Sequence, residues 1–186
     1  MPTYTPPLRD MQFVMHEVFN VVDEFKNLPP HAEVDADTIN AVIEEGGKFA
    51  TDVICPLNIS GDTEGCTLDK ATHEVKTPTG FNDAYAKYVE GGWPALSCDT
   101  AYGGQGLPLV IQAGIAEVTT GSCMAFSMLP LMGRAASRLL IGHANEALKE
   151  CVVPRLVSGE WTATICISEP QAGSDVGRIT TRAIRG

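Results

Sequence analysis

Residues 164–176 decide the fold class of this 186-residue chain, and they read Thr164-Ile165-Cys166-Ile167-Ser168-Glu169-Pro170-Gln171-Ala172-Gly173-Ser174-Asp175-Val176. The β-branched residues before Ser168 predict a strand, and Pro170 with Gly173 predicts the turn that ends it. Small residues in such a turn let the backbone approach a ligand closely. The hydroxyls of Ser168 and Ser174 would then lie at a strand end. Two interpretations remain open: a contact for an anion or cofactor, or an ordinary serine-capped turn.

The residues before this stretch predict a mainly α fold. Apolar residues recur at three- and four-residue spacing from Met11 to Phe25, which predicts an amphipathic helix that ends at Pro29. Residues 57–79 are rich in Gly, Thr, Asp and Pro and predict a long loop or a weak hairpin. Other apolar runs predict a bundle of about five or six helices, with the further members near residues 35–54, 81–90, 109–127, 130–141 and 145–157.

Strands are predicted only near the end of the chain, at residues 161–167 and 179–184. Their sheet partners are not evident in the sequence, and unpaired strand edges invite pairing with another chain. We therefore expect the last 20 or so residues to be undefined, to pack on the bundle as irregular chain, or to pair across a dimer. Pairing is favoured because Ile165, Ile167, Ile179 and Ile184 are apolar, so a homo-oligomer is expected.

Composition excludes several classes of protein. A formal net charge of −10 argues against nonspecific nucleic-acid binding, which needs Lys and Arg against phosphates. Arg178, Arg182 and Arg185 near the end either form a solvated face or contact phosphates. The six cysteines form no CxxC pair, and no histidine lies at metal-ligand spacing from them. Neither a metal site nor a disulfide framework is therefore predicted. With no leader-like start and no long apolar run, we expect a cytoplasmic protein without a membrane span.

Three motifs, in order, resemble the flavin-dependent acyl-CoA dehydrogenase family. Residues 168–175 are similar to its TEPxAGSD signature, with Ser168 where Thr is usual. Residues 90–108, from Glu90-Gly91-Gly92-Trp93-Pro94 to Tyr102-Gly103-Gly104-Gln105-Gly106-Leu107-Pro108, resemble its GW…YGGxGLP stretch, although Asp99-Thr100 replaces a common proline and acid. Residues 142–161 resemble the helix and the Ser158-Gly159-Glu160-Trp161 turn before the flavin strand. Residues 4–11 resemble the N-terminal extension of a long subgroup that includes methylmercaptopropionyl-CoA dehydrogenase-like enzymes.

The resemblance implies the N-terminal portion of such an enzyme. The family's fold divides the chain into an N-terminal extension helix at 1–34, an α-helical bundle domain at 35–159 and the start of an incomplete β-domain at 160–186. The family's cofactor is FAD and its substrate an acyl-CoA thioester, which loses a proton to a glutamate and a hydride to the flavin. Carried over by position, the cofactor-binding residues are Ile165, Ile167, Ser168, Gly173 and Ser174. Ser174 also adjoins the substrate path.

No residue of this chain inherits the catalytic role. Glu169 matches a family position that is not the base, and a structural role for its carboxylate is expected. The family's glutamate base belongs to a later helical bundle, so the 186-residue chain is expected to be inactive and to hold FAD weakly or not at all. The alternative is a stand-alone helical binding or assembly module without catalysis. Four residues on the buried helix either line the acyl cavity or pack in the core: Thr119, Thr120, Cys123 and Met124.

Overall fold

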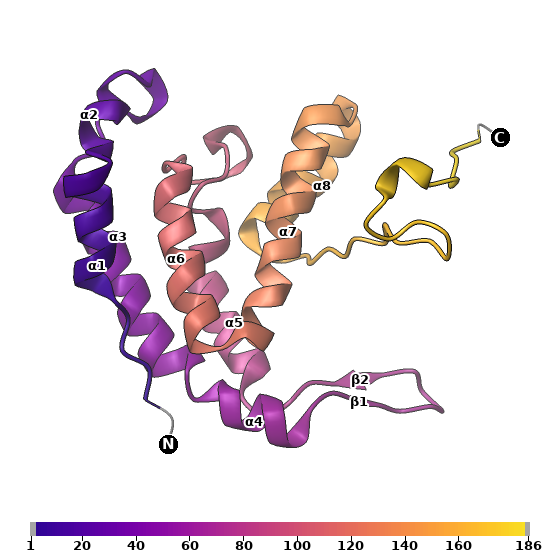
Figure 1. Cartoon of the computed structure of the whole chain (residues 1–186). Helices are drawn as coiled ribbons and strands as arrows, with labels where there is room; N and C mark the ends of the chain where they lie inside the picture. Colours follow the sequence, from indigo (N-terminus) through magenta and orange to yellow (C-terminus); the bar gives the residue numbers. More distant parts are fainter. Residues whose placement is uncertain (1–2, 185–186) are drawn as a thin grey trace.

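Helix α6 (Leu109–Ser122) runs through the middle of the helical body in the computed structural model, which describes residues 3–184. Its Ile111, Ile115 and Val118 side chains are almost fully buried. Helix α3 (Ala36–Phe49) packs on one side of α6 and α7 (Met124–His143) on the other (Figure 1). A helix that is apolar on nearly all faces is stable in water only when neighbours cover it. The surrounding helices are therefore arranged about α6.

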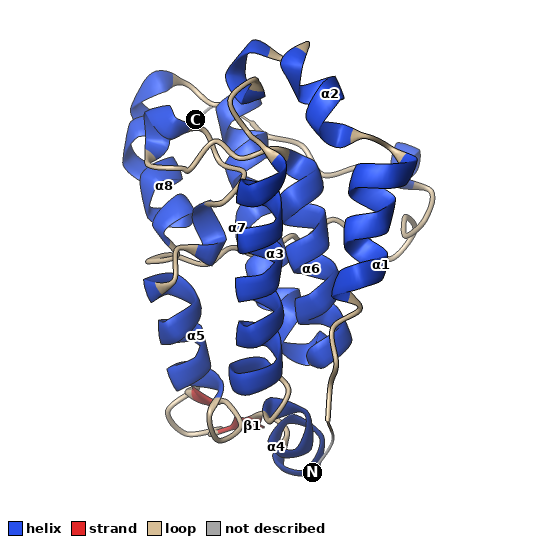
Figure 2. Cartoon of the chain, turned by 90° about the vertical axis from the view of Figure 1, so that its left-hand side faces the viewer, coloured by secondary structure: helices blue, strands red, loops and turns tan. Residues whose placement is uncertain are grey.

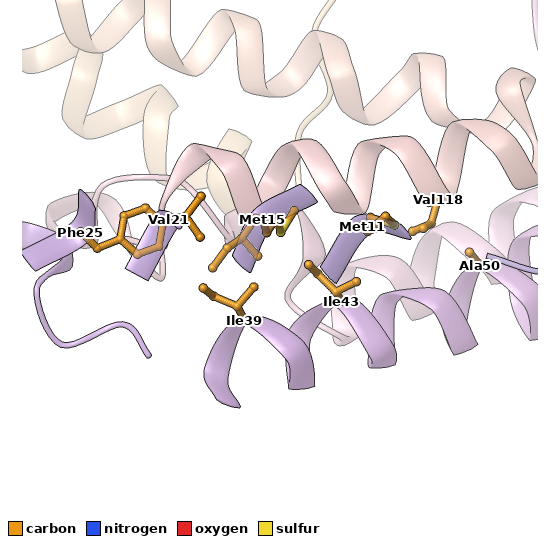
Figure 3. Close-up of a cluster of buried hydrophobic side chains, with 9 residues drawn as sticks. Met11, Met15, Val21, Phe25, Ile39, Ile43, Ala50 and Val118 are labelled. Atoms are coloured by element: carbon orange, nitrogen blue, oxygen red, sulfur yellow. The ribbon is translucent and has the colours of Figure 1, made fainter. Parts of the chain in front are cut away.

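The N-terminal helices cover the joint between α3 and α6. Helix α1 (Leu8–Gln12) continues as a π-helical stretch (Phe13–Val18), and α2 (Val21–Lys26) begins after Asn20, whose φ of 46° breaks the helix. A 3₁₀ turn (Pro29–His31) follows. Figure 3 shows Met11 and Met15 from these segments beside Ile39 and Ile43 of α3. The predicted helix is present but interrupted, and it shares its core with the bundle; the domain boundary at residue 34 stays a prediction.

Helix α3 starts where its sequence predicts. The Asp35 carboxylate caps it by accepting a hydrogen bond from the Thr38 backbone N–H at 2.8 Å. The helix then continues as a π-helical segment (Ala50–Ile54), so the predicted span of about 35–54 is confirmed. Near its middle an added Cβ at Gly46 would overlap Ile115 Cδ1 of α6. The Gly46 position is thus explained by close helix packing, which outweighs the low helix propensity of glycine.

Residues 57–79 differ in part from expectation. Their first eight residues form helix α4 (Leu57–Glu64), and only the rest forms a hairpin, in which β1 (Thr67–Leu68) pairs antiparallel with β2 (Val75–Lys76). Leu57 is buried in the core, and the Asn58 side chain donates to the Ser122 carbonyl at the end of α6. These contacts hold α4 against the bundle despite a loop-like composition. Tertiary packing here overrides local propensity.

Helix α5 (Phe81–Glu90) and helix α8 (Glu146–Ser158) complete the body (Figure 2). Between α5 and α6 lie two 3₁₀ turns, Trp93–Ala95 and Thr100–Tyr102, and the Trp93 ring packs 5.7 Å from that of Phe49, centroid to centroid. The Asn145 side chain caps α8 by accepting from the Leu148 N–H. Both helices agree with the predicted ranges.

The break between α6 and α7 lies at Cys123, not before Pro130 as the sequence predicts. Cys123 is extended, with φ −156° and ψ 100°, and its side chain is 1 % exposed. Pro130 sits inside α7, and Pro154 likewise sits inside α8. A proline normally interrupts a helix by removing one hydrogen bond, yet both helices continue through their prolines.

The mainly α fold class is confirmed, whereas the predicted strands are absent from the described residues. Residues 161–167 and 179–184 form no ladder, and the last part of the chain extends away from the helices (Figure 1). The only pairing after α8 within residues 3–184 is an isolated bridge between Glu169 and Ala172. The sequence pattern marks an extended segment, but a strand also needs a hydrogen-bonding partner. Pairing across a dimer stays a prediction.

Replacing Gly46 by Val should lower the free energy of unfolding by about 1–3 kcal/mol, because the new side chain overpacks against Ile115. Gly133→Val is the matched control, since Gly133 also lies inside a helix but an added Cβ there meets nothing within 4 Å. Its effect should stay within about 0.5 kcal/mol. Urea unfolding followed by circular dichroism measures both; equal effects would contradict the packing explanation.

Candidate functional site

The end of α8 fixes where the candidate site begins. Gly159 stops the helix with a φ of +79°, and its carbonyl accepts a hydrogen bond from the Tyr85 hydroxyl at 3.0 Å. An added Cβ would lie 2.7 Å from a Val89 methyl carbon, so close packing as well as φ favours glycine. The Arg155 guanidinium then stacks 4.6 Å from the centroid of the Trp161 ring. These contacts attach the start of the extended segment to the bundle.

The extended segment presents its polar and apolar groups to solvent. The side chains of Ile165 and Ile167 are about half exposed, at 52 % and 50 %. Within residues 3–184 the backbone groups of both isoleucines make no hydrogen bond, and neither does the hydroxyl of Ser168. Their hydrogen-bonding capacity is therefore available to another molecule.

A tight turn follows and brings the remaining predicted residues next to this segment. The Glu169 N–H donates to the Ala172 carbonyl at 2.8 Å, and the Ala172 N–H donates back at 3.0 Å. Ala172 is buried, whereas Gly173 and Ser174 are exposed, and an added Cβ at Gly173 meets nothing within 4 Å. The structure thus places Ser168 and Ser174 on either side of one turn, but the strand that was predicted before this turn is absent from the described residues.

Glu169 has a structural role in that turn. Its two carboxylate oxygens accept hydrogen bonds from the backbone N–H and the hydroxyl of both Thr180 and Thr181, and one oxygen also accepts from the Gln171 amide. The Thr181 hydroxyl and the two threonine N–H groups lower the pKa of Glu169 to about 2. A carboxylate held in its charged form by four or five donors is a poor proton acceptor. The expectation that Glu169 is not the catalytic base stays a prediction.

We call this arrangement the Glu169 clamp, comprising Glu169, Gln171, Thr180 and Thr181. It ties the turn to residues eleven and twelve positions further along the chain. The two threonines could not be identified from the sequence, because nothing there indicates which donors fold back onto the acid. Arg178 and Arg182 are exposed near the clamp, and Arg185 lies outside the described residues.

A second feature is a cavity of about 210 Å³ between α5, α6 and α7. Thr119, Thr120 and Met124 line it, whereas Cys123 belongs to the buried core cluster around Trp93. Three of the four residues for which the sequence allows either core packing or a place in the acyl cavity therefore line the cavity. Sequence analysis does not identify the other lining side chains, which include Tyr88, Gln112, Ile115, Phe126, Ser127, Leu131 and Arg134.

The polar groups of this cavity sit in an apolar wall. Arg134 donates a hydrogen bond of 3.1 Å to the Tyr88 hydroxyl. Burial raises the pKa of Tyr88, although Arg134 opposes the shift, so this hydroxyl stays protonated near neutral pH. The cavity lining contains neither a carboxylate nor a histidine. Gln112 is a polar residue within the largely apolar run 109–122, and this was the signal in the sequence that could have identified it as a candidate site residue.

Comparison with known proteins identifies the family. Residues 67–160 match the model of the acyl-CoA dehydrogenase N-terminal domain. The chain belongs to the acyl-CoA dehydrogenase family. It is 35 % identical over 182 residues to 3-methylmercaptopropionyl-CoA dehydrogenase of Ruegeria pomeroyi, a match covering 98 % of this chain and 30 % of the relative.

Two further acyl-CoA dehydrogenases give similar coverage. A butyryl-CoA dehydrogenase of Syntrophomonas wolfei is 33 % identical, over 96 % of this chain and 29 % of its own length. A broad-specificity linear acyl-CoA dehydrogenase of Mycobacterium tuberculosis is 29 % identical, over 100 % and 30 %. The chain thus spans about 30 % of the length of these relatives. Among the described residues, no helix is both long and apolar enough to cross a bilayer, and no three potential metal ligands gather.

Substituting Glu169 by Gln should loosen the turn, because a neutral amide cannot accept all the hydrogen bonds of the Glu169 clamp. We expect faster hydrogen exchange at the Thr180 and Thr181 amides with the helices unchanged. Glu150→Gln, at an exposed carboxylate on α8, is the control. The clamp should also depend on pH. The pKa of Glu169 in the folded state is lowered to about 2. The contribution of the clamp to the stability of the turn is therefore complete above pH 4.5, the ordinary pKa, and is lost as the pH falls through 2. Unchanged exchange at both threonines in the variant would contradict the clamp.

Proposed function

We propose that this chain forms one wall of the flavin and substrate site of an acyl-CoA dehydrogenase, an oxidoreductase that introduces a double bond between Cα and Cβ of an acyl-CoA thioester. The observation that carries the proposal is the turn at 168–174, whose hydroxyls and preceding backbone groups have no partner within the described residues. When bound, FAD supplies the hydride acceptor. The chain supplies hydrogen bonds and an apolar surface.

The residues fit a flavin. Backbone groups of Ile165 and Ile167 and the hydroxyl of Ser168 would hydrogen-bond the polar edge of the ring, while the exposed isoleucine side chains offer an apolar surface. Gly173 leaves open space beside the turn, where a phosphate could approach Ser174. The Glu169 clamp would hold this donor set in place before the cofactor arrives, which lowers the cost of ordering it on binding.

The cavity between α5, α6 and α7 fits the acyl chain. Its volume of about 210 Å³ lies below the usual range for drug-sized ligands and suits a short chain. The butyryl and 3-methylmercaptopropionyl groups in the names of the relatives are of that size. Apolar walls provide the affinity for methylene groups. We therefore propose a short-chain acyl-CoA as substrate, with Ser174 beside its path.

Location and assembly form part of the same proposal. Five cysteines, Cys66, Cys98, Cys123, Cys151 and Cys166, are free thiols, which suits a reducing compartment and agrees with a cytoplasmic enzyme. The exposed isoleucines of the last segment suit either a further part of the enzyme or a second subunit, and we propose a homo-oligomer.

The 186-residue chain should bind FAD only weakly, because one exposed wall cannot enclose the ring. We expect the protein to lose FAD on gel filtration but to quench flavin fluorescence in titration. Ser168→Ala should raise the dissociation constant by about three- to tenfold through one lost hydrogen bond. Ser158→Ala is the control, since that hydroxyl bonds the helix end at the Arg155 carbonyl. Absence of any quenching by FAD would contradict the proposed site.

The chain alone should not oxidise an acyl-CoA. No carboxylate or histidine lines the cavity to take the α-proton, and a missing general base typically costs about 10²–10⁴ in rate. The measurement is dye reduction with butyryl-CoA and added FAD, with boiled protein as the blank. Turnover abolished by boiling would show that a residue of this chain acts as the base.

A further inference from the structure

Gln112 is a buried side chain that the helical body leaves unsatisfied. It lies on α6 with 4 % of its surface exposed, and neither its Nε2 nor its Oε1 has a hydrogen-bond partner. Buried amides in folded proteins are nearly always paired, so an exception calls for an explanation. Core packing does not provide one, because Leu or Met would fill the same position without polar atoms.

The unpaired amide lies at the cavity between α5, α6 and α7, where Arg134 supplies further unused donors. An arginine carries five N–H groups, and within residues 3–184 the guanidinium of Arg134 makes one hydrogen bond, to Tyr88. No carboxylate of the described chain lies within ion-pair distance of it. Donors on two different helices therefore line one cavity whose other walls are largely apolar.

Other polar groups of the cavity are already engaged. The Thr119 hydroxyl donates to the Ile115 carbonyl at 2.8 Å, and the Ser127 hydroxyl donates to the Met124 carbonyl at 2.9 Å. Both bonds lie within a single helix and need no ligand. Gln112 and Arg134 are thus the groups whose hydrogen bonds a bound molecule would complete.

We propose that the acyl chain held in this cavity carries a hydrogen-bond acceptor, which the Gln112 amide and the Arg134 guanidinium recognise. The inference rests on the proposed function and adds a substrate class to it: acyl-CoA thioesters substituted by an ether-like atom or ending in a carboxylate, in preference to plain alkanoyl thioesters. Such a cavity discriminates against an analogue that lacks the acceptor, because the buried Gln112 amide then stays unpaired.

The test compares three thioesters of equal chain length: pentanoyl-CoA, 3-methoxypropionyl-CoA and glutaryl-CoA. Each is titrated into the ¹⁵N-labelled 186-residue chain, and binding is followed by the backbone signals of α6 and α7 and by the Gln112 side-chain NH₂ signal. We expect at least one polar probe to bind about tenfold tighter than pentanoyl-CoA and to shift the NH₂ signal. The ether and carboxylate arms distinguish a neutral from an anionic acceptor.

Variants separate the contributions of the two donors. Gln112→Leu should abolish the preference for the ether probe, and Arg134→Met should abolish any preference for the carboxylate. Ser158→Ala on α8, outside the lining, should leave the preferences unchanged. Should Gln112→Leu fail to fold, the NH₂ signal of the wild-type chain still decides the question.

The outcomes separate this inference from the proposed function. If all three probes bind equally, or if the preference survives Gln112→Leu, the cavity holds an acyl chain with water on the amide, and only the inference is wrong. If none of the probes shifts signals of α6 or α7, the acyl cavity itself is misplaced, and both fail.

Discussion

The close approach of α3 to α6 is the contact on which the helical body depends. Gly46 brings the two backbones together over Ile115, and Gly114 of α6 leaves room for the methyl ends of Met11 and Met15, which would lie 3.0 and 3.1 Å from an added Cβ. Two missing side chains thus allow α6 to be covered both by α3 and by the N-terminal helices. Without that cover, α6 would expose a nearly continuous apolar surface. The cavity and the candidate flavin turn both rely on the position of α6 and its neighbours.

The helices were predictable to the extent that local signals determine them. Acceptors at Asp35 and Asn145 and the glycine at 159 mark helix ends by chemistry that the sequence displays directly. Helix α4 and the break at Cys123 were not predictable in this way. They depend on the burial of Leu57 and Cys123 and on the hydrogen bond from Asn58 to the Ser122 carbonyl, and these contacts involve residues far away in the chain.

The candidate site also has one part that local sequence determines and another part that only the folded chain shows. The serines and glycine of the turn follow from a contiguous motif, and the structure has a tight turn there, closed by the Glu169–Ala172 hydrogen bonds. Gln112, Tyr88 and Arg134 lie on three helices, so only the folded chain shows that they share a cavity. The failure of the predicted strands has a different physical origin. Extended backbone is a local property, whereas a sheet is a property of at least two segments.

The residues that line the cavity between α5, α6 and α7 differ in how deeply they are buried. Gln112, Ile115 and Thr119 of α6 and Phe126 of α7 are buried, whereas other lining residues are exposed: Thr120 of α6 and Met124, Met128 and Leu131 of α7. Substitutions at the buried lining positions therefore cost stability, while those at the exposed positions change the cavity with little effect on the core. Natural variation in acyl selectivity can accordingly accumulate at the exposed positions, with the buried ones kept constant by the demands of folding. A helical body of this kind can therefore change its acyl selectivity through single substitutions that act independently of one another.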